Sequence, residues 1–114
     1  MSDSLKPQLL EYALGPALRA FSTTRQGGVS RDNYASFNIN AYCGDEADSI
    51  RQNKQALCDE LGIEPQRLIM PHQTHTACVR VVDEAFFASS AAEQQAALEG
   101  VDALITDQTR LCIG

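Results

Sequence analysis

The segment from Asp48 to Leu61, DSIRQNKQALCDEL, limits most strongly what this chain can fold into. Its apolar residues recur at helical spacing and share one face: Ile50, Leu57, Cys58 and Leu61. This pattern predicts an amphipathic helix whose apolar face packs against other elements. Asp48 is suited to cap the start of this helix. Gly62 lies just past its end. Helices often terminate at a residue in the left-handed conformation, and glycine adopts this conformation more easily than any other residue.

Extended segments lie on both sides of this helix. Residues 17–24 (ALRAFSTT) alternate in the manner of a strand. The strand runs into RQGGVS, where Gly27 and Gly28 allow a turn with positive φ. Short strands are also predicted after the helix, in QRLIM (66–70) and in the β-branched ACVRVV (77–82).

The last part of the chain adds a second helix and a further strand. SAAEQQAAL (90–98) begins with a Ser-x-x-Glu capping box formed by Ser90 and Glu93, and VDALITD (101–107) resumes a strand. Strands interleaved with two helices indicate a mixed α/β architecture. Neither an internal repeat nor a low-complexity linker divides the chain, so we interpret residues 1–114 as one domain or part of one.

The composition excludes several classes of partner. Of the 114 residues, 44% are hydrophobic and 21% are charged, which is typical of a folded globular chain. The formal net charge of -6, without a cluster of Lys or Arg, disfavours binding to nucleic acid or to an anionic membrane surface. No apolar run approaches the roughly 18 residues that span a bilayer, and the N-terminus lacks the pattern of a signal peptide. We therefore expect a cytoplasmic protein.

The four cysteines form no CxxC pair: Cys43, Cys58, Cys78 and Cys112. Without such a pair, neither a zinc ribbon nor a redox motif is indicated. Because cytosolic thiols are kept reduced, we expect thiols in the core or on the surface rather than disulfides.

The only two histidines, His72 and His75, lie three positions apart in PHQTH. On a helix they would share a face, but Pro71 and the β-type residues that follow predict extended chain, where an offset of three places side chains on opposite faces. The pair is therefore not expected to chelate one ion. One histidine can face a site while the other points away, and the spacing alone favours a hydrogen-bonded structural histidine over a metal ligand.

Two polar residues near the glycine turn are candidates for ligand binding. Arg25 ends the first predicted strand, and its guanidinium beside exposed backbone N–H groups of the turn would form a receptor for phosphate or carboxylate. The alternative is a solvated arginine or a surface ion pair. Asn38, in NYASFNIN, either hydrogen-bonds a ligand or caps a turn. The residues alone leave both alternatives open.

Five short segments follow one another in an order that resembles one protein family. They are FSTTRQGGVS, YASFNIN, GDEADSIRQNKQAL, PHQTH and VDALITD. Their order and spacing are similar to those of the YfiH family, also called the multicopper polyphenol oxidase or laccase-domain family. The resemblance extends from residue 18 to residue 114. It implies a layered α/β/β/α fold and one zinc ion, or sometimes copper, bound by two histidines and a cysteine.

By this resemblance His75 is a metal ligand, and Gln73 precedes it in the family's Q-x-H pattern. His72 stands where the family often has another polar residue. The two remaining ligands are expected in T-A-D-C and A-A-H-A-G-W-R segments downstream of the last motif, and Cys112 is not expected to replace that cysteine. The chain therefore resembles the first half of a domain about twice as long, and we expect it to be inactive alone.

The resemblance also implies an enzyme that acts on purine nucleosides when it is full length. We expect phosphorolysis of adenosine, inosine and related compounds to the base and ribose 1-phosphate, with adenosine deamination as a second activity. Arg25 would hold phosphate, His75 would help hold the metal, and Gln73 and Asn38 would orient the substrate. One alternative is oxidation of phenols, for which two histidines are too few to bind several coppers. The others are a peptidoglycan-editing amidase and an inactive fragment or interaction module.

Overall fold

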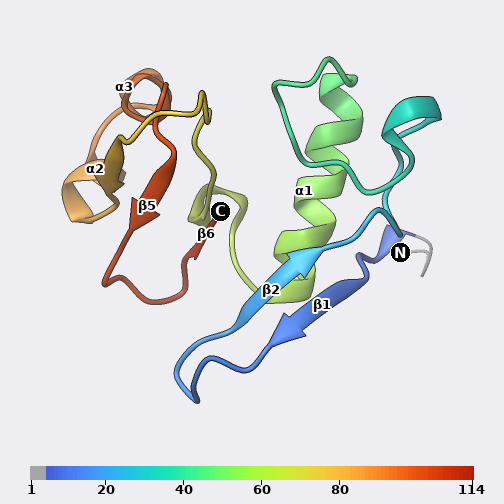
Figure 1. The fold of residues 1–114 in the computed structure, drawn as a ribbon, viewed down its shortest axis with the longest axis horizontal. Helices are drawn as coiled ribbons and strands as arrows, with labels where there is room; N and C mark the ends of the chain where they lie inside the picture. The colour runs from blue at the N-terminus through green and yellow to red at the C-terminus, as the bar shows by residue number, and fades with distance from the viewer. Residues whose placement is uncertain (1–4) are drawn as a thin grey trace. The chain divides into compact units, whose positions relative to one another are not determined.

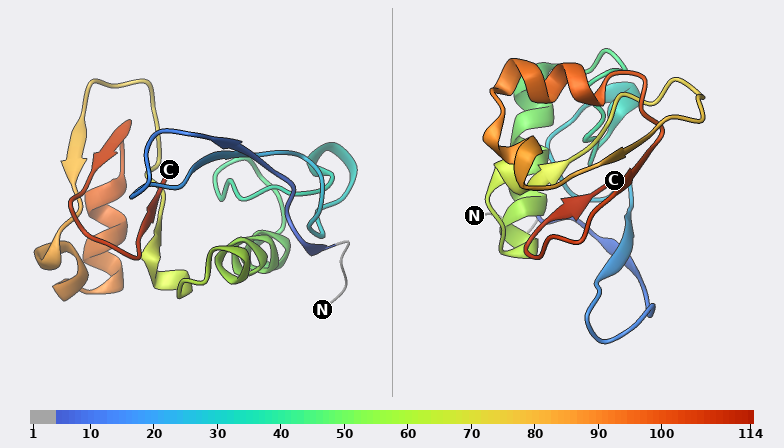
Figure 2. Two further views of the ribbon diagram at one scale, coloured as in Figure 1. Left: turned by 90° about the horizontal axis from the view of Figure 1, so that it is seen from below. Right: turned by 90° about the vertical axis from the view of Figure 1, so that its left-hand side faces the viewer.

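The computed structural model describes residues 5–114, which form two compact units divided between Gly62 and Ile63 (Figure 1 and Figure 2). Both units contain helices and strands. The expected mixed α/β (α+β) class is therefore confirmed. Within residues 5–114, no helix combines the length and the apolar character needed to cross a membrane.

The first unit consists of a two-stranded hairpin, a long loop and the longest helix. β1 (Leu9–Tyr12) pairs antiparallel with β2 (Ala20–Thr23). The loop holds a short 3-10 helix, η2 (Asp32–Tyr34), and leads into α1 (Ala47–Leu61). The strand predicted in residues 17–24 is confirmed over Ala20–Thr23, whereas the sequence does not indicate its partner β1.

Helix α1 begins earlier than the sequence predicts. Its N-cap is Glu46, whose backbone is extended, so the prediction of Asp48 as N-cap is wrong. Ala47 is a good helix former and extends the helix toward the N-terminus. Asp48 lies in the first turn, where its carboxylate accepts a hydrogen bond from Gln52 at 2.7 Å and meets the positive end of the helix dipole. Gly62 ends the helix with φ 69°, as predicted.

The buried face of α1 is mostly apolar. Its buried residues are Ile50, Asn53, Ala56, Leu57 and Cys58. Phe37, from the loop before the helix, is buried in the same unit. Removal of these apolar side chains from water provides most of the driving force for folding of this unit.

The second unit contains two pairs of parallel strands. A short 3-10 helix, η3 (Pro65–Arg67), precedes β3 (Leu68–Ile69), which pairs with β6 (Cys112–Ile113). β4 (Val79–Val81) pairs with β5 (Ala103–Ile105). The strands predicted in residues 66–70, 77–82 and 101–107 are confirmed in shorter form.

Two short helices connect β4 to β5, because parallel neighbours need a crossover. They are α2 (Glu84–Ala88) and α3 (Ala91–Leu98). α3 begins with the predicted capping box: the backbone N–H of Glu93 donates to Ser90 Oγ at 3.2 Å, and the backbone N–H of Ser90 donates to Glu93 Oε1 at 3.1 Å. The sequence does not indicate α2, which is capped by the carboxylate of Asp83.

The core of the second unit is formed by Ile69, Val82 and Phe86. Partly buried apolar residues pack against them: Phe87, Ala97, Leu98, Leu104, Leu111 and Ile113. These residues come from both strand pairs and from both helices, so one small core joins the elements of the unit.

Candidate functional site

Arg25 and Asn38 line one shallow hollow in the first unit. The hollow has a volume of about 470 Å³, and its other lining residues are Thr23, Thr24, Asn33, Tyr34, Ala35 and Phe37. Arg25 Nε donates a hydrogen bond to the carbonyl of Ala35 at 3.3 Å. In the part of the chain that the structure describes, the two Nη atoms of Arg25 have neither a hydrogen-bond partner nor an ion pair. These nitrogens are available to an anion.

The backbone of Arg25 is held more firmly than its side chain. Its carbonyl accepts hydrogen bonds from the backbone N–H groups of Ser36 at 2.9 Å and Phe37 at 3.0 Å, and from Ser36 Oγ at 2.9 Å. These bonds join the end of β2 to the segment that carries Asn38. The exposed guanidinium is therefore attached to a backbone that hydrogen bonds hold in place.

The backbone N–H groups after Gly27 are engaged within the protein. Gly28 N donates to a carbonyl of the N-terminal segment at 3.1 Å, and Ser30 N donates to the carbonyl of Ser36 at 3.0 Å. Val29 N donates to the side chain of Asn53 at 2.8 Å. The prediction that the turn offers exposed N–H groups to an anion is wrong for these three residues, because buried N–H groups must pair when the turn packs against other segments.

Close packing explains the glycine at position 28. Gly27 and Gly28 have φ 87° and 78°, as the turn requires. A Cβ atom on Gly28 would lie 2.5 Å from Asn53 Oδ1 and 2.6 Å from the carbonyl oxygen of Ser36. Only glycine fits this approach without displacing its neighbours.

Asn53 connects the glycine turn to the Asn38 segment. Its side chain is fully buried on α1. Its Oδ1 accepts the hydrogen bond from Val29 N, and its Nδ2 donates to the carbonyl of Asn38 at 2.7 Å and to Ser30 Oγ at 2.9 Å. Asn53 is not among the candidate residues predicted from the sequence. The available signal is a polar residue three positions after Ile50 on the predicted apolar face, because a buried amide there needs partners.

Asp45 adds a carboxylate to the same set of contacts. Its Oδ2 accepts hydrogen bonds from Ser30 Oγ at 2.6 Å and from Asn38 Nδ2 at 3.1 Å, and its Oδ1 accepts one from the backbone N–H of Glu46 at 2.8 Å. The bond from Ser30 is the main reason that the pKa of Asp45 lies below its ordinary value. Burial raises this pKa in part, and the bonds from Asn38 and Glu46 lower it further.

The side-chain amide of Asn38 is largely used within the unit. Its Nδ2 donates to Asp45 Oδ2 and to Cys43 Sγ, the latter at 3.2 Å. Its Oδ1 accepts a hydrogen bond from the backbone N–H of Asn40 at 3.1 Å, so the predicted alternative of a turn cap is confirmed. An amide oxygen can accept two hydrogen bonds. One acceptor position is therefore left for a ligand.

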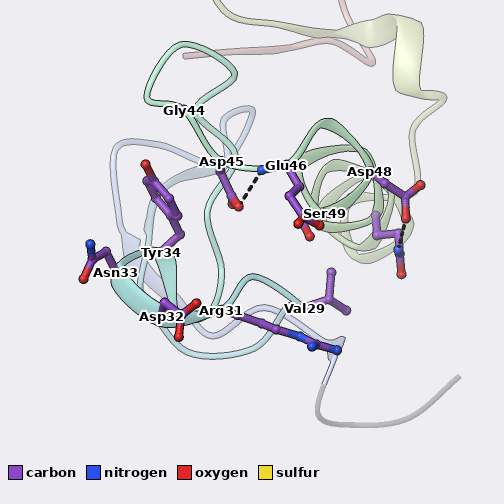
Figure 3. Close-up of a pocket in the computed structure, with 11 residues that line it drawn as sticks. Val29, Arg31, Asp32, Asn33, Tyr34, Gly44, Asp45, Glu46, Asp48 and Ser49 are labelled. Carbon is purple, nitrogen blue, oxygen red and sulfur yellow. Dashed lines mark hydrogen bonds between the residues drawn. The ribbon is translucent and has the colours of Figure 1, made fainter.

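A second, larger hollow of about 800 Å³ lies between the loop around η2 and the start of α1 (Figure 3). Asp45, Glu46 and Asp48 line it near the helix, and Arg31 and Tyr34 line it near η2. Its carboxylates outnumber its arginine, so it suits an anion less well than the hollow at Arg25.

His75, in the second unit, has a left-handed backbone with φ 62°. The prediction of extended chain is wrong at this residue. Its neighbours are anchored: Thr74 N donates to Asp102 Oδ1 at 2.9 Å, and Thr76 Oγ1 donates to the carbonyl of Gly100 at 2.7 Å. A left-handed histidine costs on the order of 1 kcal/mol, and the flanking hydrogen bonds help to offset this cost.

Asp102 is a charged group that contacts the His75 connection through Thr74 and Thr76. Burial raises the pKa of Asp102, but hydrogen bonds from Thr74 and Thr76 and the charge of His75 together hold this pKa below its ordinary value. The His75 ring makes no hydrogen bond to any other residue of the described chain 5–114.

His72 has a different environment from His75. Its Nδ1 lies 2.8 Å from both carboxylate oxygens of Glu99. Its backbone is also bonded on both sides, with His72 N donating to the carbonyl of Leu98 at 3.0 Å and Gly100 N donating to the carbonyl of His72 at 3.0 Å. The prediction of a hydrogen-bonded structural histidine is confirmed for His72.

Gln73 precedes His75 in the same connection, and both side chains are exposed. Gln73 Nε2 donates a long hydrogen bond of 3.4 Å to the carbonyl of Asp102. Arg25 and Asn38 thus share one region of the first unit, and Gln73 and His75 share one region of the second. That both pairs bind one substrate stays a prediction.

Among the described residues, one histidine is a candidate ligand of a metal centre. His75 offers an imidazole that zinc or copper accepts. Among residues 5–114, no three His, Cys, Asp or Glu side chains are placed to hold one ion together. Cys112 is poorly suited to be a ligand, because burial raises the pKa of its thiol and disfavours the thiolate that binds metal. These residues do not form a complete centre.

Residues 19–114 match the family model described as multi-copper polyphenol oxidoreductase laccase. The match covers most of the chain, and the chain belongs to this family. The resemblance carried by the five motifs is therefore confirmed.

Two named relatives and one solved structure match most of this chain. A purine nucleoside phosphorylase from Bacteroides thetaiotaomicron is 43% identical over 93 residues, which are 82% of this chain and 34% of that protein. Adenosine deaminase RL5, from an unknown prokaryotic organism, is 43% identical over 97 residues, which are 85% of this chain and 37% of that protein. The crystal structure of YlmD from Geobacillus stearothermophilus has a TM-score of 0.72 at 28% identity, covering 83% of this chain and 35% of that one. The chain shares the fold of the part of YlmD that it matches, and it spans little more than a third of the length of each of these proteins.

Proposed function

We propose that the protein to which this chain belongs is a purine nucleoside phosphorylase that uses a zinc or copper ion. The names of the relatives support the reaction class. The observation that carries the proposal is Arg25, whose backbone and Nε are anchored while both Nη atoms are available in the hollow that Asn38 also lines. A phosphorylase must bind inorganic phosphate, and a guanidinium binds phosphate through two parallel N–H bonds.

In the proposed reaction, a phosphate oxygen attacks C1′ of the nucleoside and the bond from C1′ to the purine nitrogen breaks. The bonding electron pair and a proton pass to the base, so the products are the free base and ribose 1-phosphate. Arg25 holds the phosphate in position for attack, which lowers the entropic cost of bringing the two reactants together. Asn38 accepts a hydrogen bond from the nucleoside through Oδ1, and Gln73 orients the same substrate.

His75 is proposed as one ligand of the metal ion. With three protein ligands and one open position, a zinc ion there would supply a Lewis acid or an activated water. The further ligands would come from outside residues 5–114, and the roles proposed for Arg25 and Asn38 do not depend on the ion.

Adenosine deamination is proposed as a second activity. The relative named adenosine deaminase RL5 is as similar to this chain as the phosphorylase is, at 43% identity. In deamination, water replaces the amino group of the purine and ammonia leaves, so no phosphate is consumed. Arg25 therefore has no proposed role in the second activity.

The test measures hypoxanthine release from inosine by the full-length protein, with and without inorganic phosphate. Arg25→Gln is expected to raise the KM for phosphate about tenfold or more. The same variant is expected to keep adenosine deamination within about twofold of wild type. Arg31→Gln is the matched control, because Arg31 is an exposed arginine of the second hollow and not of the first.

Two results would contradict the proposal. If wild-type protein releases no hypoxanthine in response to phosphate, the protein is not a phosphorylase. If the KM for phosphate is the same in Arg25→Gln and in Arg31→Gln, Arg25 is not the phosphate-binding group.

A further inference from the structure

We propose that Asp45 is a positioning residue that orients the side-chain amide of Asn38, so that its oxygen accepts a hydrogen bond from the substrate. The inference rests on the proposed function, because it takes the nucleoside as the ligand of Asn38. Asp45 Oδ2 lies 3.1 Å from Asn38 Nδ2. A carboxylate can only accept hydrogen bonds, so it selects the amide orientation in which the nitrogen points toward it.

Asp45 is itself held in place by a directed chain of hydrogen bonds. Asn53 Nδ2 donates to Ser30 Oγ at 2.9 Å, and Ser30 Oγ donates to Asp45 Oδ2 at 2.6 Å. Ser30 is 5% exposed and Asn53 is fully buried, so water competes little for these bonds. The single hydroxyl proton of Ser30 goes to Asp45 while its oxygen accepts from Asn53, which fixes the direction of each bond.

The other contacts of Asn38 favour the same orientation. Asn38 Oδ1 accepts from the backbone N–H of Asn40 at 3.1 Å. Reversal of the amide would turn its oxygen toward the carboxylate of Asp45 and its NH2 group toward the N–H of Asn40. Both new pairs would be repulsive, because an acceptor would face an acceptor and a donor would face a donor. The backbone of Asn38 is tied to the same network through its carbonyl, which accepts from Asn53 Nδ2 at 2.7 Å.

This orientation determines which substrate group Asn38 recognises. Its two N–H bonds are directed at Asp45 and Cys43, so a ligand meets the remaining lone pair of Oδ1. The partner must be a hydrogen-bond donor, which in a purine nucleoside is a ribose hydroxyl or an N–H of the base. A buried or partly buried acceptor left without a donor disfavours analogues that lack the group.

The kinetic test compares Asp45→Asn with wild type in the full-length protein. The substitution keeps the size of the side chain, removes its charge and supplies an NH2 group that can stabilise the reversed amide of Asn38. We expect the KM for inosine to rise about tenfold while kcat stays within about threefold, because the lost bond is made in the ground state as well as in the transition state. Glu46→Gln is the matched control: it removes the adjacent charge at a residue whose side chain makes no capping bond, and it is expected to keep the KM for inosine.

A second kinetic arm separates positioning from a general structural effect. In an Asn38→Ala background, Asp45→Asn is expected to leave the KM for inosine unchanged, because Asp45 acts through a side chain that is no longer present. If Asp45→Asn raises the KM by the same factor in both backgrounds, the positioning role is overturned.

A structural arm does not depend on activity. The side-chain amide signals of Asn38, assigned by their loss in Asn38→Ala, are followed by 15N NMR in the substrate-free full-length protein. We expect them to shift in Asp45→Asn and to stay in place in Glu46→Gln. Unmoved signals in Asp45→Asn would overturn the inference even if the enzyme is a phosphorylase. Shifted signals in a protein without phosphorolysis would refute the proposed function and support the orientation of Asn38 by Asp45.

Discussion

The region that carries Arg25 and Asn38 and the connection that carries His75 are held together in different ways. In the first region, a buried amide, Asn53, pairs with the glycine turn, with Ser30 and with the Asn38 segment. In the second region, the side chain of His75 is exposed, and its backbone is positioned by bonds that its neighbours make to Asp102 and Gly100.

Substitutions in the first region should therefore mainly change stability, whereas substitution of His75 should mainly change ligand binding. Substitutions in the first region leave buried polar groups without partners, and such groups are costly. Substitution of the His75 side chain removes no hydrogen bond within the described part of the chain, so its main effect should be on what the ring binds.

The largest expected effect is complete loss of metal on replacement of His75. We expect the full-length protein to hold about one zinc per chain and the His75→Ala variant to hold almost none, because catalytic zinc sites depend on each of their three protein ligands. Metal content is measured by mass spectrometry, with residues 1–114 alone as a third sample expected to hold little zinc. His72→Ala is the control and should retain zinc. Zinc that persists in His75→Ala would show that this histidine is not a ligand.

Gly28→Ala should destabilise the first unit strongly. The new Cβ would lie 2.6 Å from the carbonyl of Ser36 and 2.5 Å from Asn53 Oδ1, at φ 78°. Overpacking and the left-handed backbone together suggest a loss of about 4 kcal/mol in the free energy of unfolding. Gly62→Ala is the control, because Gly62 has a similar φ of 69° and open space around it; its expected cost is about 1 kcal/mol. Urea unfolding measures both, and equal losses would mean that the close approach at Gly28 is not important.

Asn53→Ala should cost slightly less than Gly28→Ala. It leaves Val29 N and the carbonyl of Asn38 without their side-chain partner, and unsatisfied buried groups of this kind suggest a loss of about 3 kcal/mol. Gln55→Ala, on the exposed face of the same helix, should change the free energy of unfolding by less than about 0.5 kcal/mol. If the two variants unfold at the same urea concentration, the Asn53 network does not stabilise this unit.

The smallest expected effect is the pH dependence contributed by Asp45. Its pKa is lowered in the folded protein, chiefly by the hydrogen bond from Ser30, from an ordinary value of 3.8. A lowered pKa stabilises the fold above the ordinary value, and the contribution is lost as the pH falls through the folded value below 3.8. The stability difference between wild type and Asp45→Asn should therefore be constant from pH 7 to about pH 5 and shrink at more acidic pH. Thermal unfolding of both proteins from pH 7 to acidic pH measures this stability difference. A difference that does not change with pH would argue against an ionised Asp45 in the network.

Elements with strong local signals are predictable from this sequence. The helix over residues 48–61, its end at Gly62 and the capping box of Ser90 and Glu93 are all found, because helical periodicity and capping depend on residues a few positions apart. β1 has no such signal, since it becomes a strand only by pairing with β2. The start of α1 at Ala47 instead of after Asp48 could not be predicted from the sequence, because an aspartate is favourable both as an N-cap and within the first turn, where Asp48 lies.

The mixed α/β class and the family were predictable from residue patterns along the chain, and the same patterns proposed Arg25, Asn38 and His75 as site residues. Only the tertiary structure showed that Arg25 and Asn38 line one hollow, that the N–H groups of the glycine turn are already paired, and that His75 is left-handed. The physical reason is the separation of the partners along the chain: Asn53 bonds to Ser30 across 23 positions, and Asp102 bonds to Thr74 across 28. Local preferences act over a few residues, so contacts of this kind exist only once the chain has folded.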